Sequence, residues 1–253
     1  MRIILLLSIL FLAVLEINCQ SNTRVTPADT SDHQIIHDIP VSNFNFNFST
    51  LPGQPMLNGS MNNLFGNTGK RYSDIKGSPY LNPDFVDGTV TLINGKHFDK
   101  APLQFDMYSK NIIAKVEGDK HIALNKALYK SFIIPHDGKD LLFKKVNNEN
   151  PKDFFVVLFE NEDFIFFKDM YVTFRDETNK GMTTVEAKFI NRNDYYITEK
   201  GMGQTSKVKL KKKDIVNHLP RKMGNAILIY ADKNNVTLKN EDDIVKALES
   251  ITE

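Results

Sequence analysis

The sequence predicts an α+β fold, in which a mostly antiparallel β-meander, arranged as a sandwich or half-barrel, precedes a small C-terminal bundle of three short helices. Two observations lead to this prediction. Between Gly77 and Lys145, short runs of β-branched and aromatic residues alternate with turn sequences such as Asn94-Gly95 and Asp137-Gly138, as in consecutive β-hairpins. After Leu210, apolar residues no longer recur at every second position but line one face of a helix.

The N-terminus has the layout of a secretory signal peptide, residues 1–19, in which Met1-Arg2 precedes an apolar run from Ile3 to Leu15. This run is shorter than the roughly 20 residues that span a bilayer, so we expect cleavage near Gln20 and no transmembrane segment after signal removal. The protein is therefore predicted to be exported, either periplasmic or secreted. Bacterial lipoproteins are cleaved directly before a cysteine, so a lipid anchor at Cys19 is the alternative.

The remaining chain divides into three predicted regions. Residues 20–72 form a low-complexity N-terminal arm, rich in Asn, Ser, Thr, Gly and Pro, which buries too little apolar surface to order itself and is expected to be flexible. Within the arm, asparagine and phenylalanine alternate from Asn43 to Phe48, which predicts a strand laid on a sheet edge. The alternative is an aggregation-prone or partner-binding segment. Residues 73–210 form an antiparallel β region, and residues 211–253 form a C-terminal helical subdomain.

The β region is predicted to open with a turn at Gly77–Leu81 and to continue through short strands. These are Thr89–Ile93, Ala101–Phe105, Asn111–Val116, His121–Leu124, Lys130–Ile134, Leu141–Val146, Phe154–Glu160, Asp163–Lys168, Val185–Ile190, Tyr195–Thr198 and a last strand containing Val208 and Leu210. On that last strand, Lys207, Lys209 and Lys211 alternate with the apolar residues. Lysines on an edge strand protect it from pairing with another chain, and an anionic ligand is the alternative explanation.

Three helices are expected at Asp214–Leu219, Arg221–Asn234 and Glu241–Ile251. Asn240 is a suitable N-cap for the last helix, and the acidic residues after it suit the helix dipole. Helices of this length are unstable alone, so they should pack on each other and on the end of the sheet. The cluster expected to do so contains Ile215, Leu219, Ile227, Leu228, Val245 and Leu248.

Several of these segments together resemble a family of uncharacterised exported proteins common in Bacteroidota. The resemblance lies in GSPYL at Gly77–Leu81, G-x-V-x-L-x-x-G-K at Gly88–Lys96, KKKDIVNHLP at Lys211–Pro220 and LKNEDDIVKALESI at Leu238–Ile251. It implies export and a layout of β-hairpins followed by C-terminal helices. The family has no established activity, so the resemblance assigns no catalytic residue.

The sequence indicates no catalytic, cofactor-binding or metal-binding residue. It lacks the G-x-S-x-G, P-loop and dinucleotide-binding sequences, and its single cysteine excludes an intrachain disulfide and thiolate metal sites. A formal net charge of +1 gives no field that would favour nucleic acid. His33 and His37 have metal-ligand spacing but lie in a segment without helical character, and His97, His121 and His136 lie near predicted turns.

The function predicted from the sequence is therefore that of an exported, non-catalytic protein. It would be a binding or envelope-assembly module that recognises a protein or small-molecule ligand in the envelope, without a cofactor. One alternative is a hydrolase whose acid and histidine, His121 or His136, meet only in the folded chain. The other is a carrier of an apolar ligand inside a β-barrel-like meander.

Overall fold

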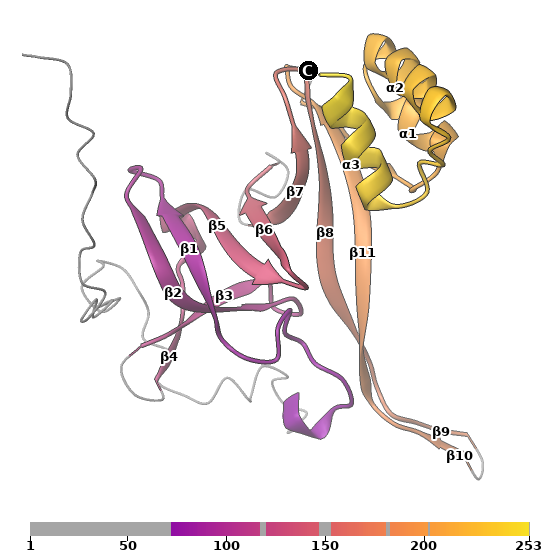
Figure 1. Ribbon diagram of the computed structural model, residues 1–253. Helices are drawn as coiled ribbons and strands as arrows, with labels where there is room; N and C mark the ends of the chain where they lie inside the picture. The colour runs from indigo at the N-terminus through magenta and orange to yellow at the C-terminus, as the bar shows by residue number, and fades with distance from the viewer. Residues whose placement is uncertain (1–71, 117–119, 147–152, 181–182, 202, 253) are drawn as a thin grey trace, which may run out of the picture. The chain divides into compact units, whose positions relative to one another are not determined.

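The computed structural model describes residues 72–116, 120–146, 153–180, 183–201 and 203–252. It contains an open, ten-stranded antiparallel sheet and three C-terminal helices, which confirms the predicted α+β fold (Figure 1). The sheet strands are β1 (Val86–Leu92), β2 (His97–Asp106), β3 (Asn111–Lys115), β4 (His121–Ala123), β5 (Tyr129–His136), β6 (Lys139–Lys144), β7 (Phe155–Glu160), β8 (Phe164–Arg175), β11 (Lys188–Glu199) and β12 (Thr205–Val208). A separate ladder joins β9 (Thr178–Lys180) to β10 (Thr183–Val185), and the helices are α1 (Lys212–His218), α2 (Arg221–Asn234) and α3 (Glu241–Ser250).

The order of the strands across the sheet is β12-β11-β8-β7-β6-β5-β1-β2-β3-β4. Two meanders, β1 to β4 and β5 to β12, are joined where β5 pairs with β1 instead of with β4. The chain makes this return through a 3-10 helix at Lys126–Leu128, whose N-cap Asn125 accepts a hydrogen bond from the Ala127 amide. The predicted meander is therefore confirmed within each run, and the β1–β5 pairing that joins the two runs brings together segments distant in sequence.

The pairing of β1 with β5 depends on a close approach at Gly88. A Cβ atom there would lie 2.5 Å from the Ile133 carbonyl oxygen and 2.9 Å from Cδ1 of Leu103. We therefore expect Gly88→Ala to lower the free energy of unfolding by about 1 to 3 kcal/mol, the usual cost of overpacking. Urea denaturation followed by circular dichroism measures this effect, and an unchanged midpoint would mean that β1 and β5 separate without cost.

The longest ladder pairs β8 with β11 along all twelve residues of each strand, from Phe164 opposite Glu199 to Arg175 opposite Lys188. In Figure 1 the ladder leads from the helices to the β9–β10 hairpin. Two separate strands were predicted for Val185–Ile190 and Tyr195–Thr198, which is wrong, because the polar residues between them keep their pairing with β8. At the next strand, β12 ends at Val208, so Leu210 and Lys211 lie outside the sheet and Lys211 is the N-cap of α1.

Two apolar clusters form the core. The first, which we call the sheet cluster, is built largely by β1 to β7 and includes Phe105, Phe132, Phe143 and Phe154, each at most 2% exposed. The second, the helix cluster, joins the three helices to one end of the β8–β11 ladder. Its members are Phe164, Phe166, Ile197, Val208, Ile215, Leu219, Met223, Ile227, Ala231, Leu238, Ile244, Ala247 and Leu248. The predicted docking of the helices is thus confirmed, although Val245 is only partly buried and Leu228 lies outside the cluster.

A short turn at Asn161-Glu162 connects β7 to β8. Asn161 Oδ1 accepts hydrogen bonds from the amides of Asp163 and Phe164, each 3.0 Å away. At the start of this turn, Glu160 is bonded by the ammonium groups of Lys144 at 2.7 Å and Lys200 at 2.8 Å. These hydrogen bonds, first that of Lys144, hold the pKa of Glu160 below its ordinary value.

A depressed carboxylate pKa stabilises the fold above the unfolded value, about 4.3 for glutamate, and this contribution is lost as the pH falls through the folded value. Glu160→Gln should therefore destabilise the protein at pH 7, by less than about 1 kcal/mol since the pair is partly exposed. The difference from the wild type should shrink progressively as the pH falls below about 4, through the lowered folded pKa of Glu160. Urea denaturation between these pH values tests this, with the exposed Glu162→Gln as the control, and a difference that persists in acid would contradict it.

Candidate functional site

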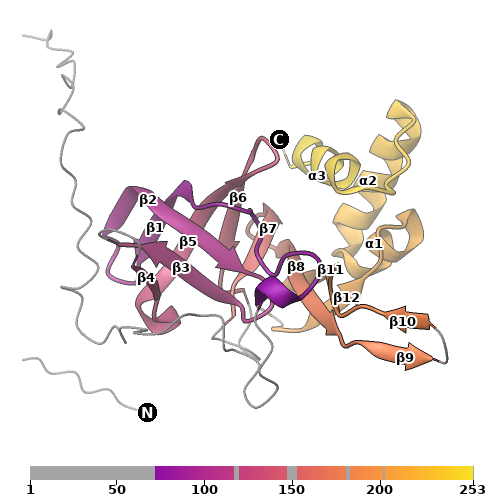
Figure 2. The same ribbon diagram turned by 90° about the horizontal axis from the view of Figure 1, so that it is seen from below.

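A groove opens where β6 and β7 diverge. These strands pair only at Phe143 with Val156 and at Lys144 with Phe155, after which β7 follows β8. The β5–β6 hairpin reaches α3 (Figure 2). There, the Lys139 ammonium lies 2.6 Å from the Asp242 carboxylate. The space enclosed by this hairpin, β7, β8 and α3 has a volume of about 560 Å³.

The walls of the groove are partly apolar. Its apolar lining consists of Leu141, Val156, Val157, Leu158, Met170 and Val245. Successive side chains of a strand point to opposite faces of a sheet. Because Val156, Val157 and Leu158 are consecutive and all line the groove, the groove meets the edge of β7 and not only one face.

An ion pair lies in the floor of the groove, in which Lys168 is buried and the Glu241 side chain is 27% exposed. The Lys168 ammonium donates hydrogen bonds to both oxygens of Glu241, at 2.8 and 3.1 Å, and the Tyr195 hydroxyl donates to Oε1 of Glu241 at 2.7 Å. The Lys168 side chain is 9% exposed. Burial and the Glu241 carboxylate raise the pKa of Tyr195, so its hydroxyl keeps its proton and remains a donor. A second hollow of about 400 Å³, bordered by Tyr195, Leu210 and Lys239, shares Glu241 with the groove.

The strand pattern of β8 explains how Lys168 reaches this position. Alternate residues share one face of a strand, so Phe166, Lys168 and Met170 point the same way. Phe166 belongs to the helix cluster and Met170 packs against the sheet cluster, which places Lys168 between the two. The N-cap Asn240, whose side chain accepts from the Asp243 amide at 2.8 Å, starts α3 so that Glu241 faces Lys168.

The sequence analysis missed this pair. Its signal was a single lysine in an alternating row of apolar residues, Phe164, Phe166, Lys168, Met170, Val172 and Phe174. Glu241 was interpreted only as a residue that suits the helix dipole. Nothing local links two residues separated by 73 positions, so the partner was not predictable from spacing.

Charged residues line the groove, with five acidic and three lysine side chains. They are Asp137, Asp140, Glu241, Asp242, Glu249, Lys139, Lys168 and Lys246. Lys168 pairs with Glu241, and Lys139 pairs with Asp242. The charges left over at the rim are then three carboxylates and one ammonium, so the mouth of the groove is acidic.

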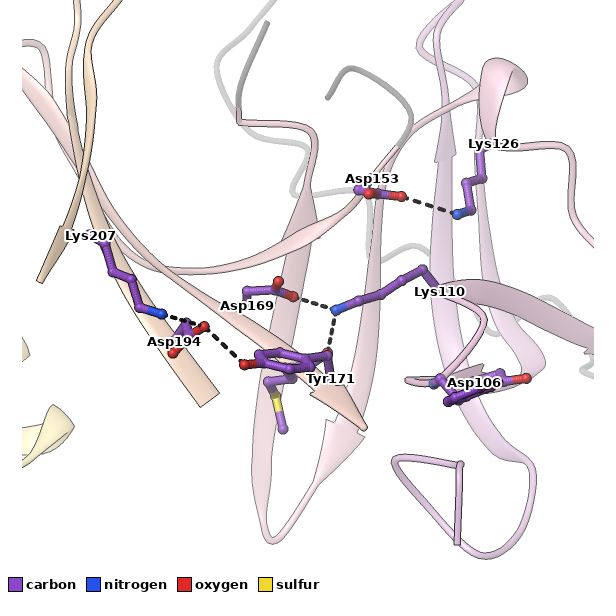
Figure 3. A network of polar contacts seen from close by, with 10 residues as sticks. Asp106, Lys110, Lys126, Asp153, Asp169, Tyr171, Asp194 and Lys207 are labelled. Atoms are coloured by element: carbon purple, nitrogen blue, oxygen red, sulfur yellow. Dashed lines mark hydrogen bonds and ion pairs between the residues drawn. The ribbon is translucent and has the colours of Figure 1, made fainter. Parts of the chain in front are cut away.

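A polar network occupies the opposite face of β8 and β11, since Asp169, Tyr171 and Asp194 alternate with the residues of the groove (Figure 3). Lys110 forms an ion pair with Asp169 and donates to the Met170 carbonyl oxygen at 2.7 Å. Asp194 accepts from the Tyr171 hydroxyl at 3.0 Å, and the Lys207 ammonium lies 2.7 Å from it (Figure 3).

This network attaches the turn between β2 and β3 to the part of β8 that follows Lys168, where β8 no longer pairs with β7. The Val172 amide donates to the Met107 carbonyl oxygen at 3.3 Å, and Lys110 satisfies the carbonyl of Met170. Burial lowers the pKa of Lys110, and the adjacent Asp169 opposes that shift. Asp169 and Asp194 of this network each have a lysine partner. The network therefore holds the strands together and offers no free carboxylate for a ligand.

The histidines are dispersed. His97 and His121 begin β2 and β4 and are exposed, and the ring of His121 packs against Phe85. His136 lines the groove, with Nδ1 2.7 Å from Oδ1 of Asn82 and Nε2 3.4 Å from a carboxylate oxygen of Asp137. His33 and His37 lie outside the described residues, as does the Asn43 to Phe48 segment. Within the described residues, no three acidic, histidine or cysteine side chains gather as they would around a metal ion.

The fold and the site together define an antiparallel α+β protein with a groove where its sheet meets its C-terminal helices. No family model, curated protein or solved structure matches the chain. In the part of the chain that the structure describes, no helix has the length and apolar character needed to cross a membrane. Membership of the exported Bacteroidota family stays a prediction from the sequence.

Proposed function

We propose that this chain is an exported, non-catalytic binding protein that holds its ligand in the groove between the β5–β6 hairpin, β7 and α3. The observation that carries this proposal is the groove itself, whose floor is the Lys168–Glu241 pair. Its volume of about 560 Å³ lies within the range of about 300 to 1,000 Å³ that is usual for ligand sites.

The arrangement of the polar groups favours binding over catalysis. Acid–base or nucleophilic catalysis needs a base that can reach a nucleophile, as well as an acid that orients the base. The described partners of His136 are Asn82 and Asp137, and neither is a hydroxyl. Lys168 and Tyr195 both use their polar atoms on Glu241.

The carrier hypothesis requires an empty apolar interior. Phe132 and Phe143 stack with ring centroids 4.4 Å apart, and Phe154 and Phe105 pack against them. These rings fill the space that an apolar ligand would need between β1 and β6. The groove outside the sheet cluster is therefore the better candidate for a ligand site.

A substitution that fills the groove tests the proposal. Val245→Trp should block the groove from α3, whereas Ile229→Trp changes a residue of α2 that is 69% exposed and lies outside the groove. We expect native mass spectrometry of protein purified from its own cells to show a bound molecule or partner with the wild type and with Ile229→Trp, but not with Val245→Trp. Equal retention by both variants, with normal circular dichroism, would place the ligand elsewhere.

A further inference from the structure

The strand β7 has an open edge inside the groove. On one side, Val157, Phe159 and Glu160 of β7 pair with β8 and Leu158 forms a bulge, while on the other side the pairing of β7 with β6 stops at Val156. In the described part of the chain, no strand covers this second side. Val157, Leu158 and Phe159 are only half-buried, so the open edge combines unpaired backbone groups with accessible apolar side chains.

The wall that faces this edge is a helix. Val245 of α3 lines the groove with Leu158 of β7, so the hollow runs between a strand edge and a helix. Extended peptides bind at such positions by adding a strand to the sheet, with main-chain hydrogen bonds for affinity and pockets for alternate side chains. A compact small molecule could fill the volume but would leave the row of backbone groups unpaired.

The excess of carboxylates at the opening of the groove favours a positively charged ligand. Asp140 and Glu249 border the groove without an ion-pair partner in the described residues, and Asp137 lies beside His136. A basic segment would be attracted, because complementary charges across an interface favour the correct partner. Two β7 edges that met in a dimer would instead bring two acidic rims together, which argues against a second copy of this chain.

We infer that the groove binds an extended segment of another protein, with lysine or arginine at alternate positions, which adds as a strand along Val157–Glu160. This inference rests on the proposed function, because it takes the groove as the ligand site. It specifies the ligand class as a basic, extended peptide. The basic residues would face Asp140 and Glu249, and the residues between them would point to the other face of the added strand.

Hydrogen exchange on the full chain tests the inference with three synthetic nonapeptides. The first alternates valine and lysine, the second alternates valine and glutamate, and the third is the lysine peptide with N-methyl groups at alternate backbone positions. The lysine peptide should slow amide exchange between Val157 and Glu160 by about tenfold or more, as expected for newly formed strand pairing. The glutamate and N-methylated peptides should have little effect.

Charge reversal at the rim supplies the matched variants. Asp140→Lys with Glu249→Lys should weaken binding of the lysine peptide by about tenfold or more, whereas Glu162→Lys, exposed in the β7–β8 turn, should not. Absence of protection on β7, or equal protection by the N-methylated peptide, would overturn strand addition. If Val245→Trp still loses the native ligand in that case, the groove remains the ligand site. Only the inference that the ligand is a basic, extended peptide would then be rejected.

Discussion

Lys168→Ala should lower the free energy of unfolding by about 3 kcal/mol, the lower end of the usual cost of removing one partner from a buried ion pair, because the Glu241 side chain left behind is 27% exposed. The ammonium of Lys168 is the cationic partner of Glu241, and it lies between the sheet cluster and the helix cluster. Without it, Glu241 would retain only the hydroxyl of Tyr195 among the hydrogen bonds that now hold it. Urea denaturation followed by circular dichroism measures the loss.

Two variants distinguish a buried pair from a surface charge. Lys139→Ala removes an ion pair with Asp242 in which both side chains are 63% exposed, so its unfolding midpoint should stay near that of the wild type. Lys168→Met combined with Glu241→Leu replaces the pair by apolar side chains and should recover most of the lost stability. Equal losses for Lys168→Ala and Lys139→Ala would show that the pair is solvated and does not join the clusters.

Phe132→Ala should cost a similar amount, about 3 to 5 kcal/mol, because it removes a fully buried aromatic ring and leaves a cavity. Phe132 is 1% exposed and stacks on Phe143, with Phe154 and Phe105 at ring-centroid distances of 5.0 and 5.8 Å. Phe105 and Phe143 lie on β2 and β6, and Phe154 directly precedes β7, so the three neighbours cannot all move into the space. The same denaturation experiment measures the effect.

A half-buried ring gives the control for this substitution. Phe98 of β2 packs at the margin of the sheet cluster, so Phe98→Ala should destabilise the protein less than Phe132→Ala. A loss at Phe132 no larger than that at Phe98 would mean that the sheet cluster repacks around the missing ring. That result would also reopen the possibility of a ligand inside the sheet.

Local chemistry determined the elements of this fold. At Asp137-Gly138, both residues adopt positive φ, 49° and 75°, as a two-residue hairpin turn requires, so β5 and β6 follow directly from this dipeptide. Asn161 and Asn240 also act locally, because the side-chain oxygen of each accepts hydrogen bonds from backbone amides two or three residues further along the chain. Such interactions depend on neighbours in the sequence, and the spacing of residues is enough to predict them.

Only the tertiary structure decided which elements meet. The pairing of Thr89 with Ile133 places β5 beside β1, and hairpin propensity favours the sequential order instead. The groove exists because β7 leaves β6 after Val156 and because α3 lies across the gap. The sequence shows Lys168 as a single charge in a row of apolar residues. Its role in the fold depends on the ion pair with Glu241, a residue 73 positions away that only folding brings close. The periodicity of a strand predicts which face of the sheet a residue lies on. Which other element packs on that face depends on contacts between distant segments.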